Sequence, residues 1–95
     1  MTRATNDRVT DRAHVANDGA HPVTLIIQPW AAERVLAPGA EVVVEANGPA
    51  GTHAELLVER TCDTAVVWTW PGATARVLAR DGRVLVDWTT PGGGP

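Results

Sequence analysis

The chain of 95 residues contains no lysine, no serine, no phenylalanine and no tyrosine. Without lysine it can neither form a Schiff base nor place an ammonium group in a phosphate-binding loop. Without serine it lacks the usual hydroxyl nucleophile of acyl transfer. The single cysteine, Cys62, cannot form an internal disulfide bond, and we expect it in a turn rather than as a nucleophile.

Long apolar segments and basic clusters are also missing. No run approaches the roughly 20 apolar residues of a membrane span, and the first twenty residues are too polar for a signal peptide. Eight arginines accompany eleven acidic residues, for a net charge of −3, and they form no basic stripe. These absences predict a cytoplasmic protein that binds neither membranes nor nucleic acid.

What the chain does contain is a series of short β-prone runs separated by turn-forming residues. Residues 1–12 are polar without periodicity, and we expect a flexible N-terminal arm there. Residues 13–89 form the expected domain, and residues 90–95 a flexible tail of proline and glycine. The β-prone runs are 13–16, 23–28, 32–36, 41–46, 53–60, 64–70, 74–79 and 83–88.

These seven or eight runs recur about every ten residues and show no helical period. They predict an all-β fold, a small antiparallel β-sandwich of Greek-key or cupredoxin-like form. Residues 30–37 are the one candidate for a helical turn, and residues 47–51 are the longest expected break. Asp81-Gly82 predicts a two-residue type I′ hairpin loop.

Alternation within the runs predicts which side chains share a face. Val42 and Val44 face one way and Glu45 the other. Residues 53–60 alternate between apolar and polar, as in a strand with one solvated face. Residues 23–28 are continuously apolar, which favours a strand covered on both faces.

Two stretches carry a resemblance to known proteins: residues 22–30 with 36–41, and residues 67–72, which read Val-Trp-Thr-Trp-Pro-Gly. They resemble a group of small uncharacterised bacterial β-sandwich proteins, in which a strand ends in Glu-Pro-Trp-Gly and a Trp-Pro-Gly segment follows later. This chain differs at Gln28 and Ala31. The resemblance implies a compact β domain and transfers no activity. A likeness to cupredoxins concerns shape only, because Cys62 has no histidine after it to complete a copper site.

The aromatic residues are four tryptophans, which we consider as candidate ligand-binding residues: Trp30, Trp68, Trp70 and Trp88. Two positions apart on one strand, Trp68 and Trp70 are expected on the same face together with Val66. The pair then either fills the core or, if exposed, makes an aromatic platform for a sugar or another flat ligand. Both interpretations stay open.

Other constellations are weaker. The metal-capable residues His14, His21, His53 and Cys62 match no zinc spacing, so no metal site is expected. Glu55 and Glu59 would share a strand face about 13 Å apart, too far for a hydrolytic pair. No glycine lies ahead of a helix as in a phosphate-binding loop, so we expect no nucleotide or other cofactor.

The sequence favours a non-enzymatic binding or protein-interaction module, with a protein partner or a second copy of the chain. The first alternative is a domain that binds a small molecule or carbohydrate through the tryptophans. The second is a small enzyme of cyclase or isomerase type, with an apolar pocket and one acid or base.

Overall fold

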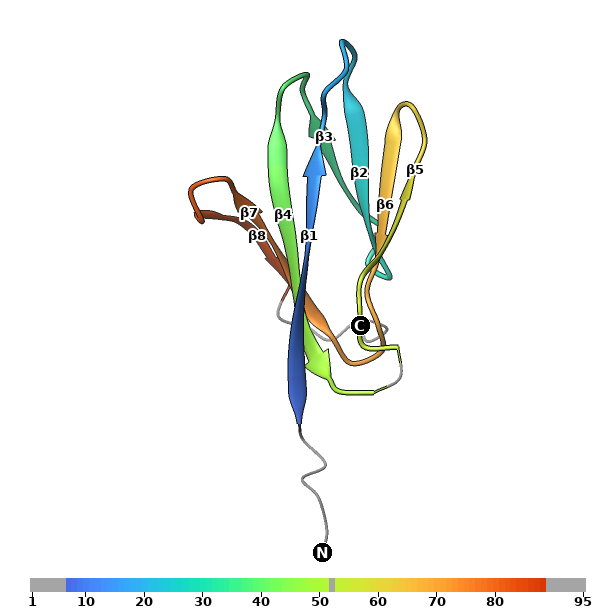
Figure 1. Ribbon diagram of the computed structural model, residues 1–95, viewed down its shortest axis with the longest axis vertical. Coiled ribbons are helices and arrows are strands. Elements are labelled where there is room, and N and C mark those ends of the chain that lie inside the picture. The colour runs from blue at the N-terminus through green and yellow to red at the C-terminus, as the bar shows by residue number, and fades with distance from the viewer. Residues whose placement is uncertain (1–6, 52, 89–95) are drawn as a thin grey trace, which may run out of the picture.

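The computed structural model describes residues 7–51 and 53–88, and every regular element in these ranges is a β-strand (Figure 1). The strands are β1 (Arg8–Ala16), β2 (Val23–Gln28), β3 (Ala32–Leu36), β4 (Glu41–Pro49), β5 (Leu57–Arg60), β6 (Thr64–Trp68), β7 (Thr74–Ala79) and β8 (Val84–Trp88). The described residues therefore contain no helix that could cross a membrane.

The strands form two sheets of four, with the orders β1-β4-β7-β8 and β3-β2-β6-β5 (Figure 1). Five of the six strand pairs are antiparallel, and β2 pairs with β6 in parallel. We call β1-β4-β7-β8 the first sheet and β3-β2-β6-β5 the second sheet. This architecture confirms the prediction of a small, mostly antiparallel β-sandwich.

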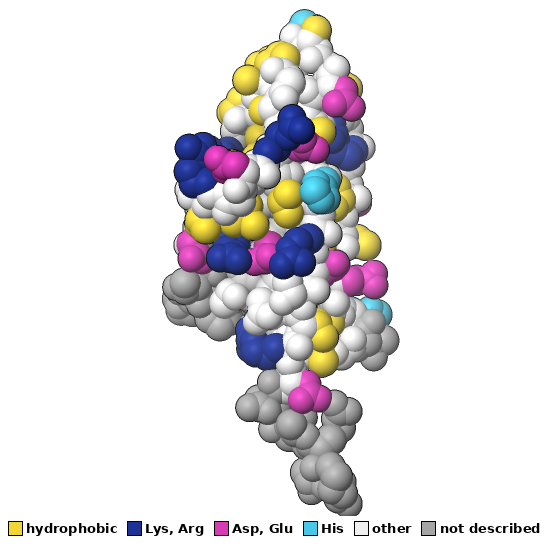
Figure 2. Space-filling view, turned by 60° about the vertical axis from the view of Figure 1, so that its left-hand side comes forward, with side chains coloured by type: hydrophobic (Ala, Val, Ile, Leu, Met, Phe, Trp, Pro, Cys, Tyr) yellow, Lys and Arg dark blue, Asp and Glu magenta, His cyan; other side chains and the backbone are white. Residues whose placement is uncertain are grey.

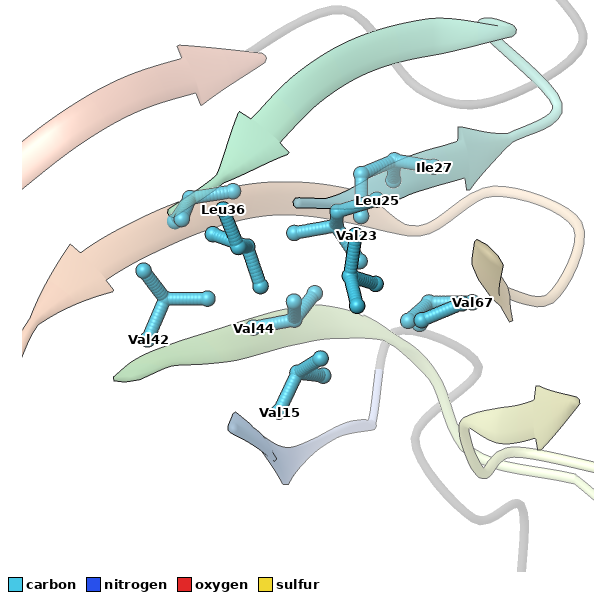
Figure 3. Packing of buried hydrophobic residues seen from close by; sticks show 10 residues of the cluster. Val15, Val23, Leu25, Ile27, Leu36, Val42, Val44 and Val67 are labelled. Carbon is cyan, nitrogen blue, oxygen red and sulfur yellow. The ribbon is translucent and has the colours of Figure 1, made fainter. Parts of the chain in front are cut away.

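The core lies between the two inner faces and consists of small and branched apolar side chains (Figure 3). Its buried members are Val15, Val23, Leu25, Ile27, Leu36, Val42, Val44, Ala65, Val67 and Val77. They come from every second position of their strands, because side chains alternate across a sheet. The expected facing of Val42 and Val44 is thereby confirmed.

A second cluster, Ala46, Trp70, Ala73 and Ala75, closes one end of the sandwich. Trp70 is only 6% exposed, and its indole N–H donates a hydrogen bond to the carbonyl of Pro49 at 2.9 Å. The ring lies so close to β4 that a Cβ placed on Gly48 would come within 2.8 Å of Trp70 Nε1. One large ring, with its polar atom satisfied, thus fills the space that three alanines leave open.

Buried Asn17 links the β1–β2 connection to the β3–β4 connection. Its side-chain nitrogen donates to the carbonyls of Leu36 at 2.9 Å and His21 at 2.8 Å, and its side-chain oxygen accepts from the backbone of Gly19. Its own backbone is bonded to Ala40 and Gly39. Every polar group of the side chain is used, as a buried amide requires.

Strand boundaries differ from the sequence prediction on several strands. The run 53–60, expected to be a strand with one solvated face, is a strand only at Leu57–Arg60, and all four of these residues are exposed. The other clear cases are β1 and β4. The expected arm ended at residue 12, but Arg8–Ala16 form β1, whose start pairs with the end of β4. The expected break at residues 47–51 is likewise wrong for Asn47 to Pro49, which continue β4. Each segment lacks an apolar pattern of its own and becomes a strand because the other supplies its backbone hydrogen bonds. Residues 1–6 and 90–95 lie outside the described part of the chain.

Residues 32–36 form strand β3, as their β-prone run predicts, and the helical turn considered for residues 30–37 does not form. Two other local predictions are corrected. In β2 only alternate residues are fully buried, so the strand is not equally covered on both faces. In the β7–β8 connection only Gly82 has a positive φ. The N–H of Ala79 donates a hydrogen bond to the carbonyl of Arg83, and the carbonyl of Ala79 accepts one from the N–H of Gly82. This is the three-residue loop with a left-handed glycine, not the type I′ loop.

Substituting Gly48 by alanine tests the contact between β4 and Trp70. The new methyl group would meet the Cα of Ala73 at 2.7 Å as well as the indole, so we expect the free energy of unfolding to fall by about 1–3 kcal/mol. Denaturant unfolding followed by tryptophan fluorescence measures it. Gly51→Ala is the matched control, since nothing lies within 4 Å of the added atom. Equal stability of the two variants would contradict the close approach.

Ala31 has a φ of 56°, the left-handed conformation that side chains with a Cβ disfavour by roughly 1–2 kcal/mol. The Glu-Pro-Trp-Gly pattern has glycine at this position. Glycine costs roughly 0.5–1 kcal/mol in chain entropy, so Ala31→Gly should raise the free energy of unfolding by about 0.5–1 kcal/mol, measured by the same unfolding experiment. Ala37→Gly, at a residue without positive φ, should lower it. A loss of stability in Ala31→Gly would contradict the strain.

Candidate functional site

The structure separates the two tryptophans that the sequence placed on one face. β6 ends at Trp68, and Thr69 then bonds to the carbonyl of Gln28 through both its N–H and its hydroxyl. The chain turns after this point, so that Trp70 enters the core whereas Trp68 stays on the outer face, 42% exposed. The prediction of a shared face is therefore wrong, because alternation holds only while the strand continues.

Trp68 projects from the outer face of the second sheet, where its neighbours hold it in place. Its indole N–H donates a 2.8 Å hydrogen bond to Glu59 Oε1 on the adjacent strand. Leu57, which is 59% exposed, lies directly opposite Trp68 in the β5–β6 register. The ring is thus fixed at its polar edge, while part of its apolar surface remains in water.

Beside Trp68 lies an open groove of about 270 Å³. It is lined by Trp68, Trp70, Leu57, Pro71, Thr69, His53 and Glu55. The apolar members offer a surface on which a flat or extended group can stack, and the polar members can accept or donate hydrogen bonds at its rim. The geometry suits binding by contact and hydrogen bonding.

The groove adjoins the open edge of the second sheet. β5 is the last strand of that sheet, and all four of its residues are exposed. Thr61 N–H bonds to the carbonyl of Thr64 at 2.8 Å, which makes these two residues a hydrogen-bonded pair. Because such pairs alternate along antiparallel strands, the backbone groups of Val58 and Arg60 point away from β6, toward the open edge.

The other two tryptophans do not contribute to this groove in the same way. Trp30 is partly buried and packs against both core clusters. Trp88 ends β8, but its side chain lies outside the described part of the chain. Of the four candidate ligand-binding residues, the structure therefore brings only Trp68 and Trp70 to one groove, and Trp70 contributes little surface.

The remaining candidates from the sequence are dispersed. His14 lies on β1, His21 in the β1–β2 connection, and His53 beside the groove. Cys62 is an exposed free thiol in the β5–β6 turn. Within residues 7–51 and 53–88, no group of three His, Cys, Asp or Glu side chains could hold a metal ion.

The prediction that Glu55 and Glu59 share one strand face is wrong. β5 begins only at Leu57, so Glu55 precedes the strand. Glu59 accepts the hydrogen bond from the indole N–H of Trp68. The two carboxylates therefore take different parts: Glu59 positions the exposed ring, and Glu55 lines the groove beside it.

The sequence did not reveal an ion-pair cluster on the outer face of the first sheet. Glu45 on β4 is 9% exposed and accepts hydrogen bonds from Arg12 Nε at 2.7 Å and from Arg76 Nε at 2.6 Å. Burial by itself raises the pKa of Glu45, but the hydrogen bonds and charges of Arg76 and Arg12 outweigh it, and the pKa lies below its ordinary value. The strand register alone makes this cluster, because it brings to Glu45 two arginines that lie 33 and 31 positions away in the sequence.

Glu45→Gln should lower the free energy of unfolding at pH 7 by about 1–2 kcal/mol, because both arginines lose a charged acceptor but stay partly exposed to solvent. Since folding lowers the pKa of Glu45, its stabilisation is complete above the ordinary glutamate pKa and disappears as the pH falls through the lower folded-state value. Unfolding curves across this acid range should therefore converge for wild type and variant. Glu33→Gln, an exposed residue on β3, is the control. A constant difference at all pH values would contradict the shift.

Comparison of the chain with protein-family models, with curated proteins and with solved structures gives no match. The resemblance to small bacterial proteins with a Glu-Pro-Trp-Gly pattern therefore stays a prediction.

Proposed function

We propose that this chain is a non-enzymatic binding module that recognises an extended polypeptide segment at the groove beside Trp68. The observation that carries the proposal is the exposed indole of Trp68, with exposed Leu57 opposite it. Single exposed apolar residues are common, but adjacent large ones at a sheet edge mark interaction surfaces. Covering them removes apolar area from water at about 25 cal/mol per Å².

The adjoining edge favours a polypeptide as the partner. A chain laid antiparallel or parallel to β5 would pair with the outward backbone groups of Val58 and Arg60. Such strand addition supplies main-chain hydrogen bonds, while neighbouring surface features read alternate side chains. On the outer face, the side chains of the added strand would lie next to Leu57 and Glu59.

Charge near the groove sets the preferred side chains of that partner. Glu55 lines the groove, and Glu59 lies on the outer face beside Trp68. Tryptophan is the best aromatic partner for a cation, and carboxylates at its rim add attraction for positive charge. The partner segment therefore carries arginine or lysine at alternate positions and contains no proline at its ladder positions.

Carbohydrate binding is the second candidate, and one observation favours it. A partly exposed indole, with a hydroxyl, an imidazole and a carboxylate in the same groove, can stack on a sugar ring and hydrogen-bond to its hydroxyls. The enzymatic alternative would need an acid or base in a closed apolar pocket. Glu45, whose pKa is lowered and which lies on an outer face, does not provide it. A cytoplasmic location stays a prediction.

Selection from displayed random twelve-residue peptides tests the proposal. Peptides enriched on the wild-type protein should bind it in fluorescence anisotropy titrations and should bind Trp68→Ala at least tenfold more weakly, which corresponds to about 1.4 kcal/mol. They should be rich in arginine or lysine. Val35→Ala is the matched control, since Val35 is exposed at the other edge of the same sheet, and it should change affinity less than twofold.

The folding of each variant is checked first by its unfolding curve. Peptides that bind Trp68→Ala as tightly as wild type would overturn the proposal. If no peptide is enriched but neutral oligosaccharides change the fluorescence of wild type and not of Trp68→Ala, the carbohydrate alternative replaces it.

A further inference from the structure

The outer face of the first sheet carries its side chains in rows that cross the four strands. Figure 2 shows a band of alternating acidic and basic side chains on this side of the molecule, with an apolar band next to it. The strand registers identify the charged row as Arg12, Glu45, Arg76 and Asp87, in the strand order β1, β4, β7, β8. The same registers give the next row as His14, Val43, Leu78 and Val84. We call it the apolar row after its three aliphatic members, with His14 at its β1 end.

Two more rows border these. On one side, Glu41 of β4 forms a 3.1 Å ion pair with Arg80, which follows β7. On the other side, Thr10, Asn47 and Thr74 form a polar row. Along the strands, the face thus changes from charged to apolar to charged to polar, with a row at every second residue.

Each row can face the same row of a second copy, taken in the opposite strand order, with complementary side chains in contact. A two-fold axis parallel to the strands and between β4 and β7 exchanges β4 of one copy with β7 of the other, and β1 with β8. Arg12 then faces Asp87 of the second copy, and Glu45 faces Arg76 of the second copy. Since the charged row alternates in sign over four positions, all four of its contacts join opposite charges.

The bordering rows obey the same operation. Val43 faces Leu78 of the second copy, so that apolar side chains meet. Glu41 faces Arg80 of the second copy, again with opposite charges. We infer that the outer face of the first sheet is the interface of a two-fold symmetric homodimer, with its axis parallel to the strands.

The other face-to-face arrangement is unfavourable. An axis along the charged row would place Glu45 against Glu45 and Arg12 against Arg12, and like charges in direct opposition are destabilising. The charges therefore select one orientation, although Glu45 already has partners within its own chain. Their contribution is to orientation and partner choice, whereas the apolar row contributes affinity.

Two features leave room for the contact. Within the part of the chain that the structure describes, no side chain forms an ion pair with Asp87, which lines a hollow of about 340 Å³ next to the charged row. The long side chain of Arg12, 60% exposed, can enter this hollow from the second copy. Val84, on the same strand β8 as Asp87, is 44% exposed. The second copy would cover it in the dimer.

The size of the face indicates how tight the dimer is. Four strands at a spacing of ~4.8 Å and four rows at a spacing of ~6.8 Å make a face of roughly 500 Å². Two copies then bury about 1,000 Å², the lower end for a specific interface. We expect a reversible dimer that forms at micromolar concentrations.

Sedimentation velocity of the full chain from 1 to 500 µM tests the inference. Wild type should pass from monomer to dimer in this range. Val84→Glu should raise the dissociation constant at least tenfold, because it places a charge in the apolar row. Val35→Glu is the control: it makes the same change at an exposed valine of the second sheet, and it should dimerise like wild type.

A charge exchange tests the direction of the axis. Glu41→Arg and Arg80→Glu should each weaken dimerisation when alone, because like charges then face across the interface. Their equimolar mixture should restore it, since every facing pair becomes opposite again. Glu33→Arg and Arg34→Glu, on β3 of the second sheet, change net charge equally and should dimerise like wild type both alone and mixed.

Three results would overturn the inference: a wild-type monomer up to 500 µM, a dimer weakened by Val35→Glu but not by Val84→Glu, or a mixture of Glu41→Arg and Arg80→Glu that dimerises no better than the single variants. The peptide-binding proposal concerns the second sheet and is independent of these outcomes.

Discussion

Burial of the inner side chains of β4 between the two sheets is the interaction on which the rest of the structure depends. Val44 and Ala46 are fully buried, and Val42 nearly so. Because side chains alternate along a strand, this burial forces Val43 and Glu45 to the outer face. The rows of the outer face, the ion pairs of Glu45 and the self-complementary surface all follow from the register that packs the core.

Two of the tryptophans lie in opposite environments, Trp70 in the core and Trp68 at the surface. Trp70 fills the end of a core built mainly from valine and alanine, where its N–H has a carbonyl partner. Trp68 lies on the outer face, where its indole N–H donates a hydrogen bond to Glu59. The division arises where β6 ends, because two residues that are two positions apart share a face only within a continuous strand.

The two proposed surfaces lie on opposite outer faces of the sandwich, so that one does not obstruct the other. A dimer formed through the first sheet would present one Trp68 groove on each of its far sides. A partner with two recognition segments, or two partners on one scaffold, would then gain from effective concentration provided that the linker spans the dimer. Weak association at each surface is compatible with such a role.

The sequence by itself determined the fold class, the approximate strands and the inward side of β4, because these depend on local turn chemistry and on the period of apolar residues. It could not place the start of β1 or the end of β4, whose strand character comes from each other. Likewise, it could not separate Trp68 from Trp70 or bring Arg12 and Arg76 to Glu45. Only the tertiary structure decided these features, since strand pairing joins residues far apart in the chain and the register is set by burial of a shared core.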